Sequence, residues 1–507
     1  MDANEFRRWG HALVDWVADY REHVERFPVM SPVEPGAIRK LLPSSPPLTG
    51  SSLESLVPEL DRVVLPGITH WNHPRFFAYF PSNTMYASVL ADIVIAGLGV
   101  QGMSWQTSPA ATEVEEVMMD WLRQMLDLPP TFTGVIQDTA SSATLCALVC
   151  ARERTSAHEQ VRKGLQWGFG AQGAEGDPKP QMSKQGFGAQ GAEGDPKPQM
   201  SKQGGAPLVV YASDQAHSSI EKDTLVAGFG KEYLRLIPTD DAHALRLDLL
   251  ERAIEDDLRA GLKPCAIVAA VGTTNTTALD PVRGIAELAK KHGIWLHVDA
   301  AMAGTAMILP ECRWMWDGIE LADSVVLNPH KWMGIGFDYS AYYVRDPQHL
   351  IRVMSTNPSY LRTAHDAEVK NFRDWHIPLG RRFRALKFWF VLHEQGVEGL
   401  QTRLRRDLAN AQWFKEQIDA ATDWERVAPV PLQTICIRHR PKTLVTEEEI
   451  NKHNRELAQR LNERGRVYLT PSVLKGRQMI RVSIGAQTTE REHVVELWQQ
   501  LQAESQK

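Results

Sequence analysis

The sequence lacks the features that mark several specialised classes of protein. It contains no block of lysine and arginine residues and has a formal net charge of -6, so we expect no binding to nucleic acid. The longest apolar stretch, Ala87 to Val100, contains Asp92 and is too short to cross a bilayer, so we expect no membrane segment. The N-terminus has no basic start followed by an apolar run, which argues against a secretory signal. We therefore expect a cytoplasmic protein.

Cysteine is scarce and is not arranged as a set of ligands. Five cysteines are spread over 507 residues, and none form a CxxC pair. Cys146 and Cys150 lie four residues apart in an apolar helical pattern, which predicts buried thiols and neither a metal site nor a redox site. Free thiols of this kind suit a reducing compartment.

The composition provides enough apolar material for a large catalytic domain with smaller appendages, at 43% hydrophobic and 23% charged residues. Near the N-terminus, apolar residues recur at helical spacing and predict an amphipathic helix that covers its own domain or a partner subunit. These positions are Phe6, Trp9, Leu13, Trp16, Val17 and Tyr20. Residues 31–50 are rich in Pro and Ser, which predicts an extended linker.

The middle of the chain alternates short β-branched runs with helical patterns, which predicts an α/β domain with a mainly parallel sheet. The expected strands are 207–213, 265–273, 294–301 and 324–328, and the helices between them include 247–261 and 282–293. From about residue 400, strand-like segments mix with helices and predict a small α+β domain. One segment stands apart, because residues 168–185 recur unchanged as residues 186–203. This duplicated insertion is too polar to supply a core, so we expect disorder and assign it no function.

Two residues at expected strand ends suggest chemistry. Lys331 follows an apolar strand in the segment SVVLNPHKW, and Asp299 ends the strand of IWLHVDAA, 32 residues earlier. In open α/β sheets, ligands bind beyond the carboxyl ends of the strands. A lysine there can form a Schiff base, and an acid can keep a pyridine nitrogen protonated, as pyridoxal 5′-phosphate (PLP) requires. Taken singly, Lys331 also fits a surface lysine and Asp299 a helix N-cap; the pair is the more specific signal.

Two further segments could complete such a site. VIQDTASSATLCAL passes from a short strand into a helix, with Thr139, Ala140 and Ser141 at the junction, where backbone N–H groups and hydroxyls can bind phosphate. Ordinary helix capping explains that junction equally well. His217 follows a strand in YASDQAHSS, where its ring could stack on a cofactor or serve a structural role.

With these residues in view, the sequence resembles the group II PLP-dependent decarboxylases, and among them the aromatic-L-amino-acid (DOPA-type) decarboxylases of bacteria. The motifs that carry the resemblance are HWNHPRFFAYFP (70–81), SDQAHSS (213–219), HVDAA (297–301), NPHKW (328–332) and PLGRRFRALKFW (378–389). It covers nearly the whole chain apart from residues 168–203, and the motifs occur in the family's order.

The resemblance implies a PLP-dependent transferase fold of type I, built as a homodimer with active sites at the subunit interface. It divides the chain into an N-terminal segment exchanged between subunits (1–85), a large PLP-binding domain with a seven-stranded sheet (86–400) and a small C-terminal domain (401–507). The exchanged segment gives the predicted N-terminal helix a partner subunit to cover.

The resemblance also implies roles for individual residues. Lys331 holds the cofactor, Asp299 pairs with its pyridine nitrogen and His217 stacks on its ring. Tyr360 matches a tyrosine on a mobile loop and is the candidate proton donor. The expected cofactor contacts are Thr139, Ala140, Ser141, His217, Thr274, Asp299, Ala301, Asn328, His330 and Lys331.

Further residues are implied for the substrate: Trp71, Tyr79, Phe80, Pro81, Ser82, Gln101, Met103 and Gly380. Ser82 stands where the family has threonine and keeps the hydroxyl. Gly380 leaves room for a large ring, and the aromatic residues suit an aromatic side chain. Three positions, Gln101, Met103 and Met302, depart from residues common in the family. Gln101 and Met103 lie where the partner subunit would line the pocket, so they bear on substrate preference and not on the chemistry.

The activity that the resemblance implies is decarboxylation of an aromatic L-amino acid, most readily DOPA, tryptophan or 5-hydroxytryptophan, to the arylalkylamine and CO2. One alternative is an aromatic aldehyde synthase, in which decarboxylation is coupled to oxidation by O2. Phenylalanine often replaces the loop tyrosine in such relatives, so Tyr360 favours amine release. A non-catalytic scaffold with the same fold is a third possibility, against which the joint presence of Lys331, Asp299 and His217 argues.

Overall fold

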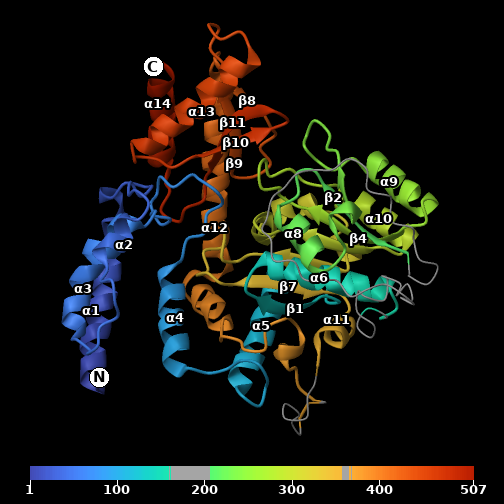
Figure 1. Cartoon of the computed structure of the whole chain (residues 1–507), viewed down its shortest axis with the longest axis horizontal. Helices are drawn as coiled ribbons and strands as arrows, with labels where there is room; N and C mark the ends of the chain where they lie inside the picture. The colour runs from blue at the N-terminus through green and yellow to red at the C-terminus, as the bar shows by residue number, and fades with distance from the viewer. Residues whose placement is uncertain (159, 161–205, 357–364, 367) are drawn as a thin grey trace, which may run out of the picture.

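A computed structural model describes residues 1–158, 160, 206–356, 365–366 and 368–507 of the chain. The duplicated insertion at 168–203 and the predicted catalytic residue Tyr360 lie outside these residues. The described chain forms a large domain around one sheet, a smaller C-terminal domain around a second sheet, and an N-terminal helical segment to one side (Figure 1). No helix in the described part of the chain is long and apolar enough to span a membrane.

The large domain contains a seven-stranded sheet in the order β1-β7-β6-β5-β4-β2-β3. Of these strands, β7 runs antiparallel to both its neighbours, and the other six run in one direction. The strands are β1 Thr133–Gln137, β2 Leu208–Ser213, β3 Leu234–Ile237, β4 Lys263–Ala270, β5 Trp295–Asp299, β6 Ser324–Leu327 and β7 Ser340–Val344. The predicted α/β fold of type I with a mainly parallel seven-stranded sheet is therefore confirmed.

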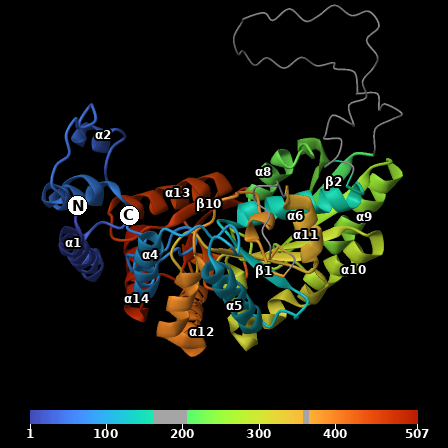
Figure 2. The same ribbon diagram turned by 90° about the horizontal axis from the view of Figure 1, so that it is seen from below.

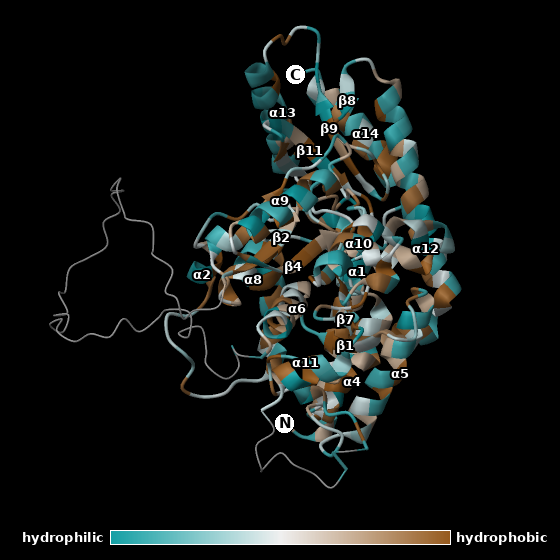
Figure 3. Cartoon of the chain, turned by 90° about the vertical axis from the view of Figure 1, so that its right-hand side faces the viewer, coloured by the Kyte–Doolittle hydropathy of each residue, from teal (hydrophilic) through white to brown (hydrophobic). Residues whose placement is uncertain are grey.

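Helices cover both faces of this sheet, and the sheet divides the core into two clusters (Figure 2). One face packs against α6, α8 and α11, and the other against α5, α9, α10 and part of α12. The interior strand β4 is buried at every position after Lys263, as expected of a parallel strand covered on both sides. Figure 3 shows the same arrangement, with hydrophobic strands inside and hydrophilic helix faces outside.

The helices follow local sequence signals. Asp2 and Glu5 form a capping box at the start of α1, and Thr446 and Glu449 form another at the start of α13. The longer helices are α1 Ala3–Glu22, α4 Tyr86–Leu98, α5 Pro109–Met125, α6 Ala140–Thr155, α9 Leu247–Arg259, α10 Val282–His292, α12 Ala385–Ala420, α13 Glu447–Glu463 and α14 Arg491–Ser505. Shorter ones are α2 Ala37–Leu41, α3 Leu56–Glu59, α8 Ser219–Val226 and α11 Pro347–Met354.

The C-terminal domain is an antiparallel sheet, in the order β10-β11-β9-β8, covered by α13 and α14. Its strands are β8 Trp424–Arg426, β9 Thr434–His439, β10 Thr470–Leu474 and β11 Arg477–Ser483. The helix α12 joins it to the large domain and is kinked at Gly396, whose φ of 59° and ψ of 179° are non-helical. The predicted boundary at residue 400 falls just after this kink.

Two local expectations need correction. The predicted linker at 31–50 contains the short helix α2, because the Ala37–Leu41 segment has no proline to interrupt it. The predicted strands also omitted β3 and β7, which are short and, in β7, flanked by polar residues. The prediction of buried thiols is confirmed, because all five cysteines are free and buried.

Candidate functional site

A cavity of about 250 Å³ opens where the parallel strands of the large sheet end. Its lining residues follow the carboxyl ends of five strands: β1, β2, β4, β5 and β6. All ten residues expected to contact a cofactor lie in this lining, together with Phe80 from the expected substrate set. The lining also contains five residues that the sequence did not single out in these roles: Ser219, Ala270, Gly272, Thr273 and Met302.

The register of the sheet explains why Asp299 and Lys331 meet. Asp299 is the last residue of β5 and pairs with Val326 of the parallel strand β6, from which the chain runs through Asn328 to Lys331. Two parallel neighbours end at the same edge, so both side chains reach the same cavity. The Oδ1 atom of Asp299 accepts a hydrogen bond from the backbone N–H of Ala301 at 3.0 Å. That contact is the local capping role expected of such a residue, and it leaves Oδ2 for a ligand.

The surroundings of Lys331 favour the neutral form of its amine. Desolvation by burial lowers the pKa of Lys331, the charge of Asp299 raises it, and the charge of Arg481 lowers it again. Burial is the largest of these causes, so the net direction is downward. The Nζ atom lies 5.5 Å from the centroid of the Phe80 ring. A lysine with a lowered pKa is a better nucleophile toward a carbonyl group.

The N-terminus of α6 forms a second part of the cavity wall. Thr139 is the N-cap residue, and its side chain accepts a hydrogen bond from the backbone N–H of Ser142 at 3.4 Å. The first backbone N–H groups of a helix have no partner within the helix and carry partial positive charge. With the neighbouring Ser141 hydroxyl, this junction has the chemistry of a phosphate site.

The two histidines of the cavity are held in defined tautomers. The Nδ1 atom of His217 accepts a hydrogen bond from the backbone N–H of Ser219 at 3.1 Å and lies 2.9 Å from the Ser219 hydroxyl. The Nδ1 atom of His330 accepts from the N–H of Tyr339 at 3.0 Å. Burial lowers the pKa of His217 and lowers the pKa of His330 to about 3. Both rings are therefore neutral near pH 7 and carry their proton on Nε2.

Arg481 of β11 belongs to the C-terminal domain and lies beside the cavity, against Phe80. This residue was not predicted from the sequence. Its guanidinium stacks on the Phe80 ring at 4.3 Å from the centroid and donates to the backbone oxygens of Tyr79 and Asn275. The side chain is almost fully buried, and burial lowers the pKa of Arg481 to about 10. The one signal for it was an arginine inside the otherwise apolar strand of QMIRVSIG.

The remaining substrate residues expected from the sequence lie outside this lining. Trp71 and Tyr79 stack on each other at 5.6 Å, and both are more than one-third exposed. The hydroxyl of Ser82 donates to the backbone oxygen of His330 at 2.7 Å, and Pro81 packs against Gly485. Three more of the expected residues lie away from the cavity within one chain, where Gln101 contacts the position of Gly380. These are Gln101, Met103 and Gly380.

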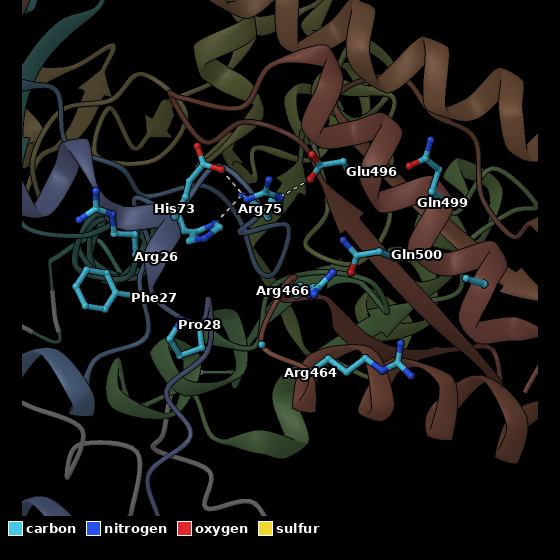
Figure 4. A pocket seen from close by; sticks show the side chains of 13 residues that line it. Arg26, Phe27, Pro28, His73, Arg75, Arg464, Arg466, Glu496, Gln499 and Gln500 are labelled. Atoms are coloured by element: carbon cyan, nitrogen blue, oxygen red, sulfur yellow. Dashed lines mark hydrogen bonds and ion pairs between the residues drawn. The ribbon is translucent and has the colours of Figure 1, made fainter.

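A larger cavity, of about 790 Å³, lies between the N-terminal segment and the C-terminal domain (Figure 4). At its centre, Arg75 is paired with Glu25 at 2.7 Å and with Glu496 at 2.6 Å. None of the residues expected at the site line it. Size alone therefore does not identify the functional cavity, and the chemistry of the lining does.

Comparison with known proteins agrees with the chemistry of the smaller cavity. The family model of the pyridoxal-dependent decarboxylase conserved domain matches residues 35–166 and 192–440. The chain belongs to the pyridoxal-dependent decarboxylase family.

Relatives of this decarboxylase match it over nearly their full length. It is 39% identical to phenylacetaldehyde synthase of Arabidopsis thaliana, over 100% of this chain and 96% of the relative. It is 38% identical to aromatic-L-amino-acid decarboxylase of Bos taurus, over 99% of this chain and 96% of the relative. The solved structure of Oryza sativa TDC with PLP and tryptamine superposes with a TM-score of 0.89 at 35% identity, over 100% of this chain and 98% of that one.

The residues of the cavity fit PLP, which is the cofactor of this decarboxylase. The lining offers a nucleophilic amine, a carboxylate, an imidazole and a helix N-terminus with hydroxyls, one for each reactive part of the cofactor. No group of three or more His, Cys, Asp or Glu side chains in the described ranges is arranged to hold a metal ion. The protein is a carboxy-lyase, and when PLP is bound its ring accepts the electron pair left by the departing CO2.

Proposed function

We propose that this decarboxylase acts on an aromatic L-amino acid, with DOPA, tryptophan or 5-hydroxytryptophan as substrates, and releases the arylalkylamine and CO2. The observation that carries the proposal is the aromatic segment 71–80, which reaches the cavity through Phe80. Phe80 lines the cavity beside Lys331, and the stacked pair Trp71 and Tyr79 belongs to the same segment of chain. Aromatic rings prefer such surfaces, where offset and edge-to-face contacts are favourable. The curated relatives named above support the same substrate class.

Each catalytic residue has a task that its surroundings support. Lys331 holds the cofactor through its amine, and Asp299 keeps the cofactor's pyridine nitrogen protonated. His217 stacks on the ring with Nε2–H available, because Ser219 occupies Nδ1. Thr139, Ala140 and Ser141 bind the phosphate at the start of α6. The remaining cofactor contacts in this proposal are Thr274, Ala301, Asn328 and His330.

The proton that returns to the substrate Cα needs a donor. Tyr360 is the candidate from the sequence, with His217 assisting, and a positioned general acid contributes about 10²–10⁴-fold. Tyr360 lies outside the residues that the structure describes, so this role rests on the sequence.

The site is completed by a second subunit in this proposal. No residue of α1 is buried within the chain, and Phe6 is 63% exposed although it belongs to the apolar pattern of that helix. Leu90 and Ile93 of α4 are each about half exposed. Exposed apolar faces of this extent suit an interface between copies of this chain. Residues 1–85 then exchange between subunits, and Gln101, Met103 and Gly380 face the partner's cavity.

An amine-release assay tests the function. The purified, PLP-loaded enzyme is given DOPA, tryptophan, 5-hydroxytryptophan, tyrosine and phenylalanine, with glutamate and histidine as comparison substrates. We expect arylalkylamine and CO2 in equal amounts from one or more aromatic substrates. Release from glutamate or histidine alone would contradict the aromatic assignment while leaving the PLP chemistry intact.

An aromatic aldehyde synthase is the second candidate, and the Arabidopsis relative favours it because its curated name is phenylacetaldehyde synthase. The two activities differ in their reactants and products, since the synthase consumes O2 and water and releases aldehyde, ammonia and H2O2 in place of the amine. Tyr360 supports the decarboxylase. Oxygen uptake during turnover separates the two activities, and Tyr360→Phe should shift the products from amine toward aldehyde. Amine as the sole product of Tyr360→Phe, at the native rate, would contradict the role of Tyr360.

A further inference from the structure

Asp223 is an acid on the buried face of α8, where the other buried side chains are already accounted for. This face contains Ser219, Ile220, Asp223 and Thr224. Ser219 contacts His217, and the Thr224 hydroxyl donates to the backbone oxygen of Ile220 at 2.7 Å. Asp223 is 5% exposed, and its Oδ2 atom is buried without a hydrogen-bond partner among the described residues.

The position of Asp223 on the helix directs it toward the cofactor cavity. Residues four apart lie on the same helix face, so Asp223 is one turn beyond Ser219, which lines the cavity. The helix α8 packs on α6, where Ile220 and Cys146 belong to one apolar cluster. The carboxyl of Asp223 therefore lies in an apolar layer behind the cavity wall, where an ionised group is costly.

Among the described residues, the charged groups that act on this carboxyl are Asp299 of β5 and Lys222 of α8 itself. The thiol of Cys146 on α6 also faces it, and burial raises the pKa of that thiol to about 12. Beyond Asp299, within reach of its charge, lie His217 and Lys331. Burial raises the pKa of Asp223 to about 7, the charge of Asp299 raises it as well, and Lys222 lowers it. Two acids that share one buried region do not both ionise readily, so one of them retains a proton.

We propose that Asp223 is a positioning residue that acts through Asp299. As a neutral acid, it leaves Asp299 as the single negative charge beside the cofactor's pyridine nitrogen. When Asp223 loses its proton, a second negative charge forms behind Asp299 and changes the protonation of the bound cofactor. The inference rests on the proposed pairing of Asp299 with the cofactor, and it gives this decarboxylase a dependence on pH near neutrality.

The visible absorption of the bound cofactor tests this directly, because it reports protonation without turnover. In the wild-type holoenzyme we expect a transition between about pH 6 and about pH 8 with a midpoint near 7. Asp223→Asn mimics the neutral acid at every pH, so the variant should keep the wild-type acid spectrum across the range. Glu221→Gln is the matched control on α8, since Glu221 is paired with Lys231 at 2.8 Å on the solvent side; it should keep the transition.

The melting temperature of the apoenzyme provides a second test that is independent of the cofactor. An acid whose folded pKa lies above its unfolded value of 3.8 lowers stability progressively as pH rises from that value to about 7. Asp223→Asn should therefore melt higher than wild type at about pH 8 and equally at about pH 4. A variant that melts lower at about pH 8, or that fails to fold, contradicts the proposal.

The result that overturns the inference is a transition with the same midpoint in Asp223→Asn as in the wild type, or no transition in the wild type. Failure of the underlying site assignment has a different signature. If Asp299→Asn binds PLP with an unchanged spectrum, Asp299 is not the partner of the pyridine nitrogen, and the proposed site is wrong whatever Asp223 does.

Discussion

Ser219 holds His217 through a single ring nitrogen: its backbone N–H lies 3.1 Å and its hydroxyl 2.9 Å from Nδ1. Because the backbone N–H of Ser219 donates to Nδ1, that nitrogen carries no proton, and the ring proton lies on Nε2. The ring therefore presents a donor to the cavity and an acceptor to α8. Since Ser219 is the first residue of that helix, the tautomer is fixed by where the helix begins.

The first prediction concerns this contact. Ser219→Ala removes the hydroxyl but keeps the backbone N–H, so His217 should retain its tautomer and lose only part of its restraint. We expect kcat to fall about ten-fold, less than the about 10²–10⁴-fold that a general acid or base contributes, because the ring stays in place, with PLP content unchanged. Ser218→Ala is the matched control, because the Ser218 side chain makes no capping hydrogen bond. Equal kcat values for the two variants would show that the hydroxyl does not position the ring.

A second prediction follows from Arg481, whose positive charge lowers the pKa of Lys331. Arg481→Met removes that charge, so the pKa of Lys331 should rise and a higher pH should be needed for a neutral amine. We expect the midpoint for PLP incorporation into the apoenzyme to move up by as much as about one pH unit. Stopped-flow reconstitution at several pH values measures it.

The control for that experiment lies on the same strand. Arg477→Gln removes an arginine that pairs with Glu425 at 2.5 Å, at the end of β11 that leads away from Phe80. It should leave the midpoint of PLP incorporation unchanged. A midpoint that is the same in wild type and Arg481→Met would mean that the charge of Arg481 does not reach Lys331.

The third prediction concerns stability. Glu115 and Arg381 form an ion pair at 2.6 Å in which both side chains are 2% exposed, and Arg381 also donates to the backbone oxygen of Ile136. Glu115→Gln leaves a buried guanidinium without its counter-charge, which costs about 3–5 kcal/mol of unfolding free energy. Glu116→Gln breaks a partly exposed pair with Lys370 at 2.9 Å and should cost at most about 1 kcal/mol. Urea unfolding of the two apoenzyme variants measures both losses. Similar losses of unfolding free energy would contradict the large contribution expected of the buried pair.

Much of the fold and of the cofactor cavity could be predicted from the sequence. Strands such as β4 and β6 are mostly apolar runs, and residues beyond the carboxyl ends of the parallel strands share one edge of the sheet by geometry alone. That is why the presence of Asp299 and Lys331 in one cavity could be predicted from the order of residues along the chain. The strand β7 was missed because polar residues flank its apolar run, and it contributes no side chain to the cavity.

Contacts between distant segments could not be predicted in the same way. Arg481 reaches Phe80 from the other domain, 401 residues further along the chain, and no local pattern encodes that approach. Asp223 lies on the short helix α8, and no pattern along the chain marks it as buried. Gln101, Met103 and Gly380 were expected at the substrate, but they do not line the cavity within one chain, and their role depends on the proposed second subunit.

The central claim is that Lys331 in the smaller cavity carries the cofactor of the working enzyme. Borohydride reduction of the holoenzyme followed by peptide mapping tests it most directly, because the reduced bond fixes the cofactor to the residue that held it. We predict one modified peptide, with the mass of the reduced cofactor on Lys331, together with complete loss of amine release. Modification of a different lysine, or amine release that survives stoichiometric reduction, would contradict the account.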